Sequence, residues 1–374
     1  MTLSNKLFAQ MRAATRSLFR RGPSVARTVF KESMKNASSL HPAVNPAVTR
    51  DAFNAASNQA SYDPFSDMLA GFSRVGQPGG NPFNVQPLSG GAGAIGLPGQ
   101  FIDASYTNDA GTRHYKLYVP SSYSGQASAL LVMLHGCTQN PDDFALGTGM
   151  NALAEENNCL VVYPAQSKGA NASRCWNWFN AVDQRHGQGE PSIIAGITGD
   201  VMARYAIDPQ QVYVAGLSAG GAMAAIMGTL YPDLYAAVGV HSGLPFAAAH
   251  DLPSAVAAMK GDFRRSRAPG RTLPIIVFHG DKYTTVHPAN GSALIGQRRR
   301  HPAETVDVEP GQVPHGHAYT RTLHRRPDGS IHAEHWVVHG SGHAWSGGDV
   351  LGTYTDGKGP NASQAMLRFF RTVR

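Results

Sequence analysis

A serine framed by glycines is the clearest candidate nucleophile in this sequence. The apolar, β-branched stretch 212–217 leads into Gly216-Leu217-Ser218-Ala219-Gly220, and an Ala- and Met-rich helical pattern follows over 222–230. A strand, a sharp turn and a helix in this order are the context of a nucleophile elbow, whose tight turn requires small neighbours. The first N–H groups of the helix then face the space above Ser218, where an anion is stabilised. The alternative is a glycine-rich turn without chemistry.

Such a serine needs a base that accepts its proton. His343 lies in a glycine-flanked loop that follows the last predicted strand, 335–338. We predict His343 as the base on this position, because most of the 16 histidines must be surface or structural residues. His339 is the nearby alternative, but it ends the same strand and is expected to pack there.

The base in turn needs an orienting acid. Asp281 is the only carboxylate in the loop 279–286, which follows the preceding strand, and it is the predicted acid. The order serine, acid, base along the chain then fits one of the known arrangements of a serine triad. Capping of the turn by the Asp281 side chain is its alternative role, and Asp251 is an alternative acid.

Negative charge that develops on an ester carbonyl needs two N–H donors. The backbone of Ala219, directly after the nucleophile, supplies one. The other is expected from the loop 135–139 after the apolar strand 129–134, and Cys137 N–H is the predicted donor. His135 is interpreted as a structural histidine that shapes this loop.

The elements that must hold these residues alternate between strand and helix. Continuous apolar runs typical of buried parallel strands alternate with helical patterns, and glycine-rich loops follow the strands. The pattern predicts a doubly wound, mostly parallel α/β sheet, which binds ligands beyond the carboxyl ends of its strands. The predicted strands are 113–119, 129–134, 159–163, 212–217, 236–240, 274–278 and 335–338, and the predicted helices are 150–157, 193–205, 222–230 and 364–372.

Five motifs occur in an order that resembles the poly(3-hydroxybutyrate) depolymerase family of esterases, which shares the α/β-hydrolase fold with acetylxylan and feruloyl esterases. They are His-Gly-Cys-Thr-Gln (135–139), Arg-Cys-Trp-Asn-Trp-Phe (174–179), Gly-Leu-Ser-Ala-Gly-Gly (216–221), His-Ser-Gly (241–243) and Gly-His-Ala-Trp-Ser-Gly-Gly (342–348). The resemblance covers about residues 103–374. It implies a serine esterase without a metal or cofactor, in which Ser218 is the nucleophile and His343 the base.

One position departs from the family. Its loop normally reads His-Gly-x-x-Asp-x-x-Val, but here Tyr283 stands where the catalytic Asp is expected, within 279–286. Either Asp281 serves as the acid from two residues earlier, or the acid is missing or replaced. Loss of the acid from such a triad typically lowers the rate about 10⁴-fold.

The resemblance also implies that Cys137 pairs with Cys175, although two thiols are expected in a reducing compartment. Trp178, Asn177 and Trp345 flank the predicted site and are predicted to contact the substrate, since aromatic side chains at a cleft stack on a polymer. Burial in the core is the alternative for the tryptophans.

Positive charge is concentrated at the start of the chain. The net charge of +7 is carried by residues 1–35, which form a predicted basic amphipathic arm suited to an anionic or apolar surface. Residues 36–102 are predicted to be a low-complexity linker, and 103–374 the catalytic domain. A body without excess basic charge argues against nucleic acid as a partner. The arm is a predicted tether to polymer granules, with packing on the domain as the alternative.

No apolar run is long enough for a transmembrane helix, and the start of the chain lacks the apolar core of a secretory signal. A cytoplasmic location, with granule association, is therefore favoured, and a trimmed or atypical export signal is the alternative. The histidines at 315, 317, 332 and 335 show no supporting ligand cluster, so no metal is expected. The predicted function is hydrolysis of poly(3-hydroxybutyrate) or its oligomers. The alternatives are a carbohydrate-ester esterase and a granule-binding protein with an impaired triad.

Overall fold

The computed structural model describes residues 96–263, 269–282, 285–297 and 302–373. The predicted arm (1–35) and the predicted linker as far as residue 95 lie outside the described residues, and so does Tyr283. The first strand begins at Gln100, so the predicted start of the catalytic domain at residue 103 falls inside a strand.

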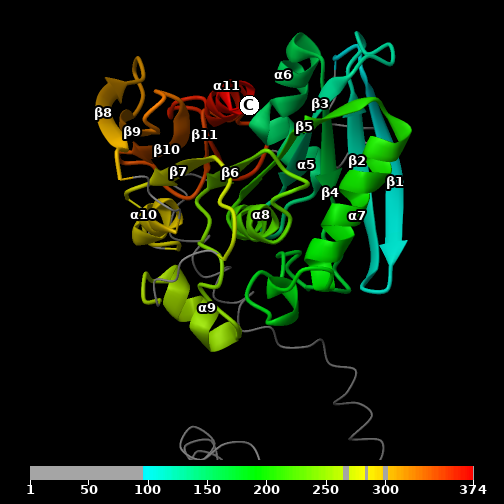
Figure 1. Ribbon diagram of the computed structural model, residues 1–374, viewed down its shortest axis with the longest axis horizontal. Helices are drawn as coiled ribbons and strands as arrows, with labels where there is room; N and C mark the ends of the chain where they lie inside the picture. The colour runs from blue at the N-terminus through cyan, green and yellow to red at the C-terminus, as the bar shows by residue number, and fades with distance from the viewer. Residues whose placement is uncertain (1–95, 264–268, 283–284, 298–301, 374) are drawn as a thin grey trace, which may run out of the picture. The chain divides into compact units, whose positions relative to one another are not determined.

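The described chain contains a ten-stranded sheet with helices on both faces (Figure 1). Its order is β1-β2-β4-β3-β5-β6-β7-β10-β9-β8. The strands are β1 (Gln100–Asn108), β2 (Gly111–Val119), β3 (Ser128–Leu134), β4 (Cys159–Pro164), β5 (Ile207–Leu217), β6 (Ala237–His241), β7 (Ile275–Gly280), β8 (Thr305–Gln312), β9 (Ala318–Arg325) and β10 (Ile331–Val338). A separate pair of short strands consists of β11 (Trp345–Ser346) and β12 (Thr355–Asp356).

The strands from β4 to β10 in this order are parallel to one another, while β1, β2, β9 and β8 are joined by antiparallel pairing at the two edges. This is the mostly parallel, doubly wound sheet that the sequence predicts. Strand β2 matches the predicted strand 113–119. Strands β1, β8 and β9 extend the sheet beyond the strands foreseen, because their largely exposed or half-exposed residues carry a weaker apolar signal than the buried central strands.

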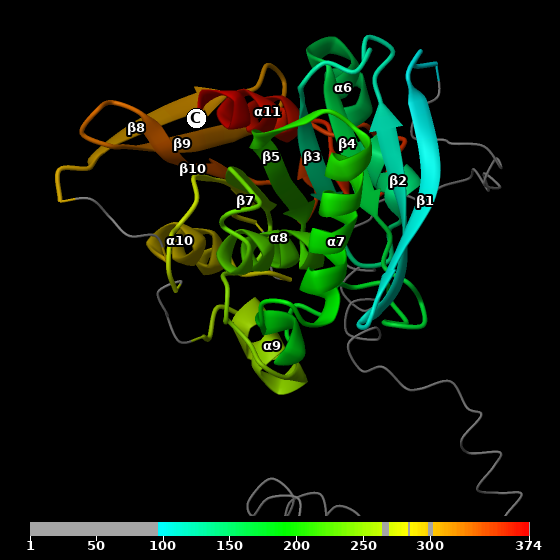
Figure 2. The same cartoon turned by 45° about the vertical axis from the view of Figure 1, so that its right-hand side comes forward.

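Two helical layers cover the sheet (Figures 1 and 2). One contains α7 and α8, and the other contains α5, α6 and α11. The helices are α5 (Pro141–Thr148), α6 (Met150–Asn157), α7 (Gly189–Arg204), α8 (Ala219–Leu230), α9 (Leu252–Met259), α10 (Ala289–Gly296) and α11 (Ala362–Thr372), with a short 3₁₀ helix at Val182–Gln184. None of these helices is long and apolar enough to cross a bilayer.

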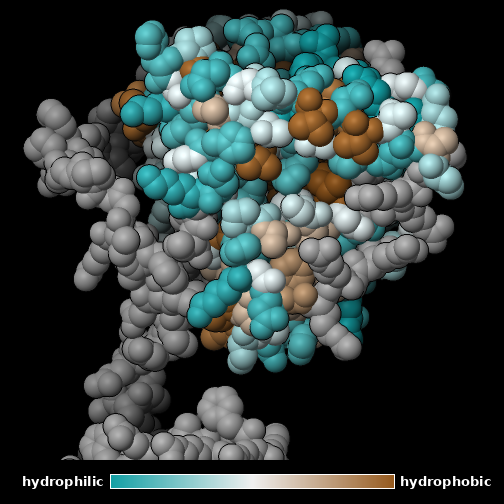
Figure 3. Space-filling view, turned by 90° about the vertical axis from the view of Figure 1, so that its left-hand side faces the viewer, coloured by the Kyte–Doolittle hydropathy of each residue, from teal (hydrophilic) through white to brown (hydrophobic). Residues whose placement is uncertain are grey.

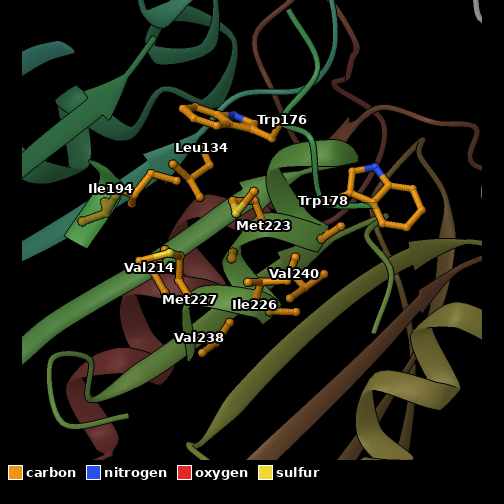
Figure 4. Packing of buried hydrophobic residues seen from close by; sticks show 14 of the residues in the cluster. Leu134, Trp176, Trp178, Ile194, Val214, Met223, Ile226, Met227, Val238 and Val240 are labelled. Atoms are coloured by element: carbon orange, nitrogen blue, oxygen red, sulfur yellow. The ribbon is translucent and has the colours of Figure 1, made fainter. Parts of the chain in front are cut away.

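Each helical layer closes its own hydrophobic core. In β5, Val212 and Val214 face the α7–α8 layer, whereas Tyr213 and Ala215 face the other, as the twofold alternation of a strand requires. Figure 4 shows the first core, in which Met227 of α8 lies beside Val214 of β5. Both faces of the sheet are therefore covered, and the loops at the strand ends remain to form a site.

Candidate active site

Ser218 occupies a strained turn between β5 and α8. Its backbone angles are φ 57° and ψ −119°, a region that non-glycine residues seldom adopt and that is enriched at functional sites. A Cβ on Gly220 would lie 2.0 Å from the Leu134 carbonyl oxygen, and one on Gly216 would lie 2.4 Å from the Gly220 carbonyl carbon. Both glycines of the motif are thus required by close backbone packing, as the sequence predicts.

A backbone hydrogen bond fixes the turn to the neighbouring strand, while Ser218 remains partly exposed to solvent. The Ser218 N–H donates to the His241 carbonyl oxygen at 2.9 Å, which ties the turn to the end of β6. Ser218 is partly exposed, whereas Ala219 and Gly220 are buried. Because Ala219 opens α8, its N–H is one of the helix-terminal donors without an intrahelical partner.

The loop that carries Cys137 is fixed at several points. A disulfide joins Cys137 to Cys175, with Cα atoms 4.2 Å apart, so the pairing implied by the resemblance is present. The Thr138 N–H donates to the Ser173 carbonyl at 2.6 Å, and the Gly136 N–H donates to Gln139 Oε1 at 2.9 Å. This loop follows β3, the neighbour of β5 in the sheet, which is the position expected of the second oxyanion donor.

His135 is buried at the start of this loop and has a structural role. Its Nδ1–H donates to the Gly136 carbonyl at 2.7 Å, and its Nε2 accepts from the Gln166 N–H at 3.1 Å. Burial lowers the pKa of His135 to about 4. The ring is therefore neutral at pH 7 and acts as a fixed bridge between two loops.

Glu190, in the first turn of α7, is a functional candidate that the sequence alone did not reveal. Its buried carboxylate accepts hydrogen bonds from the Asn177 N–H at 2.7 Å and from Asn177 Nδ2 at 2.8 Å. It also pairs with Arg113 at 3.1 Å and accepts from Gln166 Nε2. Glu190 therefore anchors the segment that follows Cys175.

Asn177 and the tryptophans are placed differently from the expectation of substrate contact. The Asn177 amide is engaged by Glu190 and by Asn171 Nδ2, at 3.0 Å. Trp178 is 2% exposed and Trp345 is 1% exposed. Trp345 stacks on the His241 ring, and its Nε1–H donates to Ser363 Oγ at 2.9 Å. The structure therefore favours the core alternative for both tryptophans, since large aromatic side chains fill a core as well as they line a cleft.

His343 belongs to a segment that docks on the end of β6. The Ser346 N–H donates to His241 Nε2 at 3.0 Å, and His343 is close enough to His241 to lower the pKa of that ring electrostatically. Burial, and to a smaller extent repulsion from His279, lowers the pKa of His343 to about 3. The ring is therefore neutral at pH 7 and able to accept a proton, but a pKa this far below 7 makes it a weaker base than an ordinary imidazole.

Asp281 lies beside His339, which differs from the expected contact with His343. Its Oδ2 accepts from His339 Nδ1 at 2.7 Å, and its Oδ1 accepts from the Gly340 N–H at 2.7 Å. Burial opposes ionisation of this carboxyl, but these two hydrogen bonds lower its pKa below the usual value. The cause is sheet register: β7 and β10 are parallel, with Gly280 opposite Val338, so the residues that follow them are neighbours.

The alternative acid, Asp251, caps a helix. Its carboxylate accepts from the Ser254 N–H at 2.9 Å and closes a capping box at the start of α9. Of the histidines considered as metal ligands, His317 pairs with Asp356 at 2.9 Å. No group of three or more His, Cys, Asp or Glu side chains suited to a metal ion occurs within the described ranges.

A serine on a strained strand–helix turn, at the carboxyl edge of a mostly parallel sheet, defines a protein of the α/β-hydrolase class. The acetyl xylan esterase from Aspergillus awamori has a similar structure, with a TM-score of 0.57 and 19% sequence identity over 73% of this chain and 100% of that one. At this identity the comparison establishes the fold alone. It confirms the predicted α/β-hydrolase fold.

The family is established by sequence. A family model described as Esterase PHB depolymerase matches residues 113–302, just over half of the 374 residues. The chain therefore belongs to this family, whose members are carboxylic ester hydrolases, as the motifs predict. Poly(3-hydroxyalkanoate) depolymerase C of Paucimonas lemoignei is 33% identical over 63% of this chain and 59% of its own length. Feruloyl esterase B of Neurospora crassa is 26% identical over 71% of this chain and 90% of its own length.

Proposed function

We propose that this protein hydrolyses ester bonds of poly(3-hydroxybutyrate) or of its short-chain oligomers through an acyl-enzyme on Ser218. The observation that carries the proposal is the strained elbow at Ser218 beside the disulfide-anchored loop of Cys137. The choice of polyester is supported by the family and by the similarity to the Paucimonas lemoignei depolymerase, of which the chain spans 59%.

In the proposed mechanism, Ser218 Oγ attacks the ester carbonyl carbon while His343 accepts the hydroxyl proton. The oxyanion of the tetrahedral intermediate accepts hydrogen bonds from the Ala219 and Cys137 N–H groups. As the intermediate collapses, the carbon–oxygen bond to the alcohol breaks and His343 gives its proton to that oxygen. Water then attacks the acyl-enzyme by the same steps, which releases the hydroxy acid and restores Ser218.

The decisive experiment compares release of 3-hydroxybutyrate from amorphous granules by the wild type, Ser218→Ala and His343→Ala. We expect either substitution to lower the rate by at least about 10³-fold, because members of a triad act as a unit. Ser330→Ala, in the surface turn between β9 and β10, is the matched control and should retain wild-type activity. Unchanged release by Ser218→Ala would remove Ser218 from the mechanism.

A carbohydrate-ester esterase is the second candidate, because the similarity to feruloyl esterase B extends over 90% of that protein. The same variants assayed on acetylated xylan and methyl ferulate separate the two functions. Faster turnover of either substrate than of polyester oligomers would favour this candidate. Labelling of Ser218 by a fluorophosphonate excludes a binding protein with an impaired triad, since an unactivated serine does not react.

The basic arm, residues 1–35, is proposed to tether the enzyme to polymer granules. Deletion of these residues should weaken granule binding and leave hydrolysis of a soluble ester intact. Equal loss of both would contradict the tether. The proposed cytoplasmic location is opposed by the Cys137–Cys175 disulfide, because such bonds persist mainly in oxidising compartments.

A further inference from the structure

Exposed apolar side chains are unevenly distributed over the described residues. The large hydrophobic side chains that are exposed are Val182, Val306, Val308, Val350, Leu351 and Tyr354. Three of them lie within the five residues 350–354, which we call the apolar turn. On the side of the molecule that carries β8, hydrophilic residues cover most of the surface and hydrophobic ones lie in small groups (Figure 3). The apolar turn thus holds half of the exposed large hydrophobic side chains of the described residues.

The apolar turn has a fixed backbone. The Gly352 N–H donates to the Asp349 carbonyl at 3.2 Å, and the Leu351 N–H donates to Asp349 Oδ1 at 2.9 Å. The Asp349 N–H donates to the Gly147 carbonyl at 2.9 Å. Gly352 packs so tightly on α5 that a Cβ there would lie 2.2 Å from Gly147 Cα. The turn therefore holds the side chains of Val350 and Leu351 on a fixed backbone.

The corner positions of this turn hold Val350 and Leu351, which are 84% and 73% exposed. Surface turns usually place Gly, Asn, Asp or Ser at such positions, because these residues satisfy the turn geometry or its hydrogen bonds. Two large aliphatic side chains held out into water by a fixed backbone gain nothing from the fold itself. They are suited to contact with an apolar surface outside the molecule.

The turn adjoins the proposed active site. Thr353 accepts hydrogen bonds from Gln139 Nε2 through its carbonyl oxygen, at 3.0 Å, and donates its N–H to Asp143 at 2.8 Å. Tyr354 OH lies 3.1 Å from Thr138 Oγ1, within the loop that carries Cys137. The Trp345 N–H donates to the Tyr354 carbonyl at 2.6 Å, two residues after His343. The apolar turn is thus hydrogen-bonded to two of the three segments that supply the proposed catalytic groups, the loop that carries Cys137 and the segment that carries His343.

We propose that the apolar turn docks on the surface of the water-insoluble polyester and so brings Ser218 to its chains. The inference rests on the proposed function and adds to it a second, non-catalytic contact with the substrate. A neutral polyester offers no charge for recognition, and burial of aliphatic surface is the interaction that remains. The hydrogen bonds of the turn to the loop of Cys137 and to the segment of His343 favour the polymer over a partner protein, because the substrate has to reach these same two segments.

The test measures binding of the full chain to amorphous poly(3-hydroxybutyrate) granules by co-sedimentation, with Ser218→Ala in every variant to prevent hydrolysis. The double variant Val350→Ser, Leu351→Ser should bind at least about tenfold more weakly, which corresponds to about 1.4 kcal/mol. The matched control is Val306→Ser, Val308→Ser on β8, where the valines are 51% and 62% exposed. Strand β8 is one of the two edge strands and is separated from β5 by four others, so the control should bind like the parent.

In the active background, the loss of hydrolysis on granules should exceed any change on soluble p-nitrophenyl butyrate by about tenfold. Equal losses on both substrates would overturn the docking role and place the turn within the catalytic site. Unchanged granule binding, or equal weakening by the β8 control, would also overturn it. A wild-type dimer that becomes monomeric in the double variant would identify a second copy as the occupant instead.

These outcomes are distinct from failure of the proposed function. If the wild type cleaves soluble esters but neither binds nor hydrolyses granules, the polyester assignment fails, and the docking proposal fails with it. If the wild type hydrolyses granules and the double variant binds them normally, only the docking proposal fails.

Discussion

The two halves of the proposed active site are built on different principles. The half around β3 and β5 is held by close backbone packing, the Cys137–Cys175 disulfide and the hydrogen bonds of Glu190. The half around β6, β7 and β10 is rich in buried imidazoles, and neither His279 Nδ1 nor His335 Nε2 has a hydrogen-bond partner among the described residues. The first half therefore fixes geometry, whereas the second keeps titratable groups in a medium that favours their neutral form.

The two halves therefore serve different requirements of the reaction: the first positions the oxyanion donors, and the second controls the protonation state of the base. A donor that stabilises an oxyanion must be in place before charge develops, and the disulfide and Glu190 supply that rigidity. A general base must be neutral before it accepts a proton, and burial keeps His343 neutral, although it also lowers the basicity of the ring. The first half should consequently be sensitive to changes in volume and hydrogen bonding, and the second to pH.

The largest expected effect is loss of stability in acid. Burial lowers the pKa of four histidines of the second half, His241, His279, His335 and His343, and also that of His135 at the start of the Cys137 loop. The pKa of His135 and that of His335 both fall to about 4. Below about pH 6.5 the unfolded chain binds protons that the folded chain does not, so His135 and His335 each destabilise the fold by about 1–2 kcal/mol at about pH 5, and the other three histidines act in the same direction. We expect the unfolding free energy to fall by about 3 kcal/mol or more between pH 7.5 and pH 5.

Asp183 opposes this trend. Burial and the charge of Glu190 raise the pKa of its carboxyl to about 6, so it stabilises the folded state as the pH falls, by about 1 kcal/mol at about pH 5. Urea titrations at the two pH values measure the sum. Equal or greater stability in acid would show that the histidine-rich half is not the pH-sensitive part.

The next largest effect is expected from a substitution that disrupts backbone packing in the half around β3 and β5. Gly220→Ala places a Cβ 2.0 Å from the Leu134 carbonyl oxygen and 2.5 Å from that of His135, so the end of β3 must move. We expect a loss of about 3 kcal/mol in the unfolding free energy together with loss of esterase activity. Gly199→Ala on α7 is the matched control, because a Cβ there meets nothing within 4 Å, and it should stabilise by about 0.5–1 kcal/mol. Thermal melts of both variants provide the comparison, and similar melts would count against the packing account.

Glu190→Gln tests the hydrogen bonds of the same half. The substitution keeps the volume but turns an NH₂ group toward the donors of Arg113, Gln166 and Asn177. We expect it to destabilise the protein by about 2–3 kcal/mol, because a buried ion pair then loses one partner. Glu156→Gln, at an exposed position of α6, should change stability by less than about 0.5 kcal/mol. Equal effects of the two substitutions would exclude an anchoring role for Glu190.

The comparison also separates what the sequence could predict from what it could not. The elbow was predictable because β5, the glycines and α8 are contiguous in sequence, and each element follows from local composition. The buried position of Trp345 could not be predicted, since an aromatic residue close to the proposed catalytic histidine is equally compatible with a cleft and with a core. Glu190 lies outside the predicted helix 193–205, and its burial depends on partners that are distant in sequence.

The smallest expected effect concerns Asp281, whose partner could not be predicted because it depends on the register of β7 against β10. Asp281→Asn should lower the turnover number less than about tenfold, because the carboxylate is bound to His339 and Gly340, whereas loss of a triad acid costs about 10⁴-fold. Its effect on stability should stay below about 1 kcal/mol, since both side chains of the His339 pair are more than a third exposed and solvent screens the pair. Steady-state rates on p-nitrophenyl butyrate measure the first value, with Tyr283→Asp as the companion variant. A higher turnover number in Tyr283→Asp would identify position 283 as the place of the missing acid. A drop near 10⁴-fold in Asp281→Asn would instead identify Asp281 as the acid. The histidine-rich half would then have to rearrange in the substrate complex to bring Asp281 to His343.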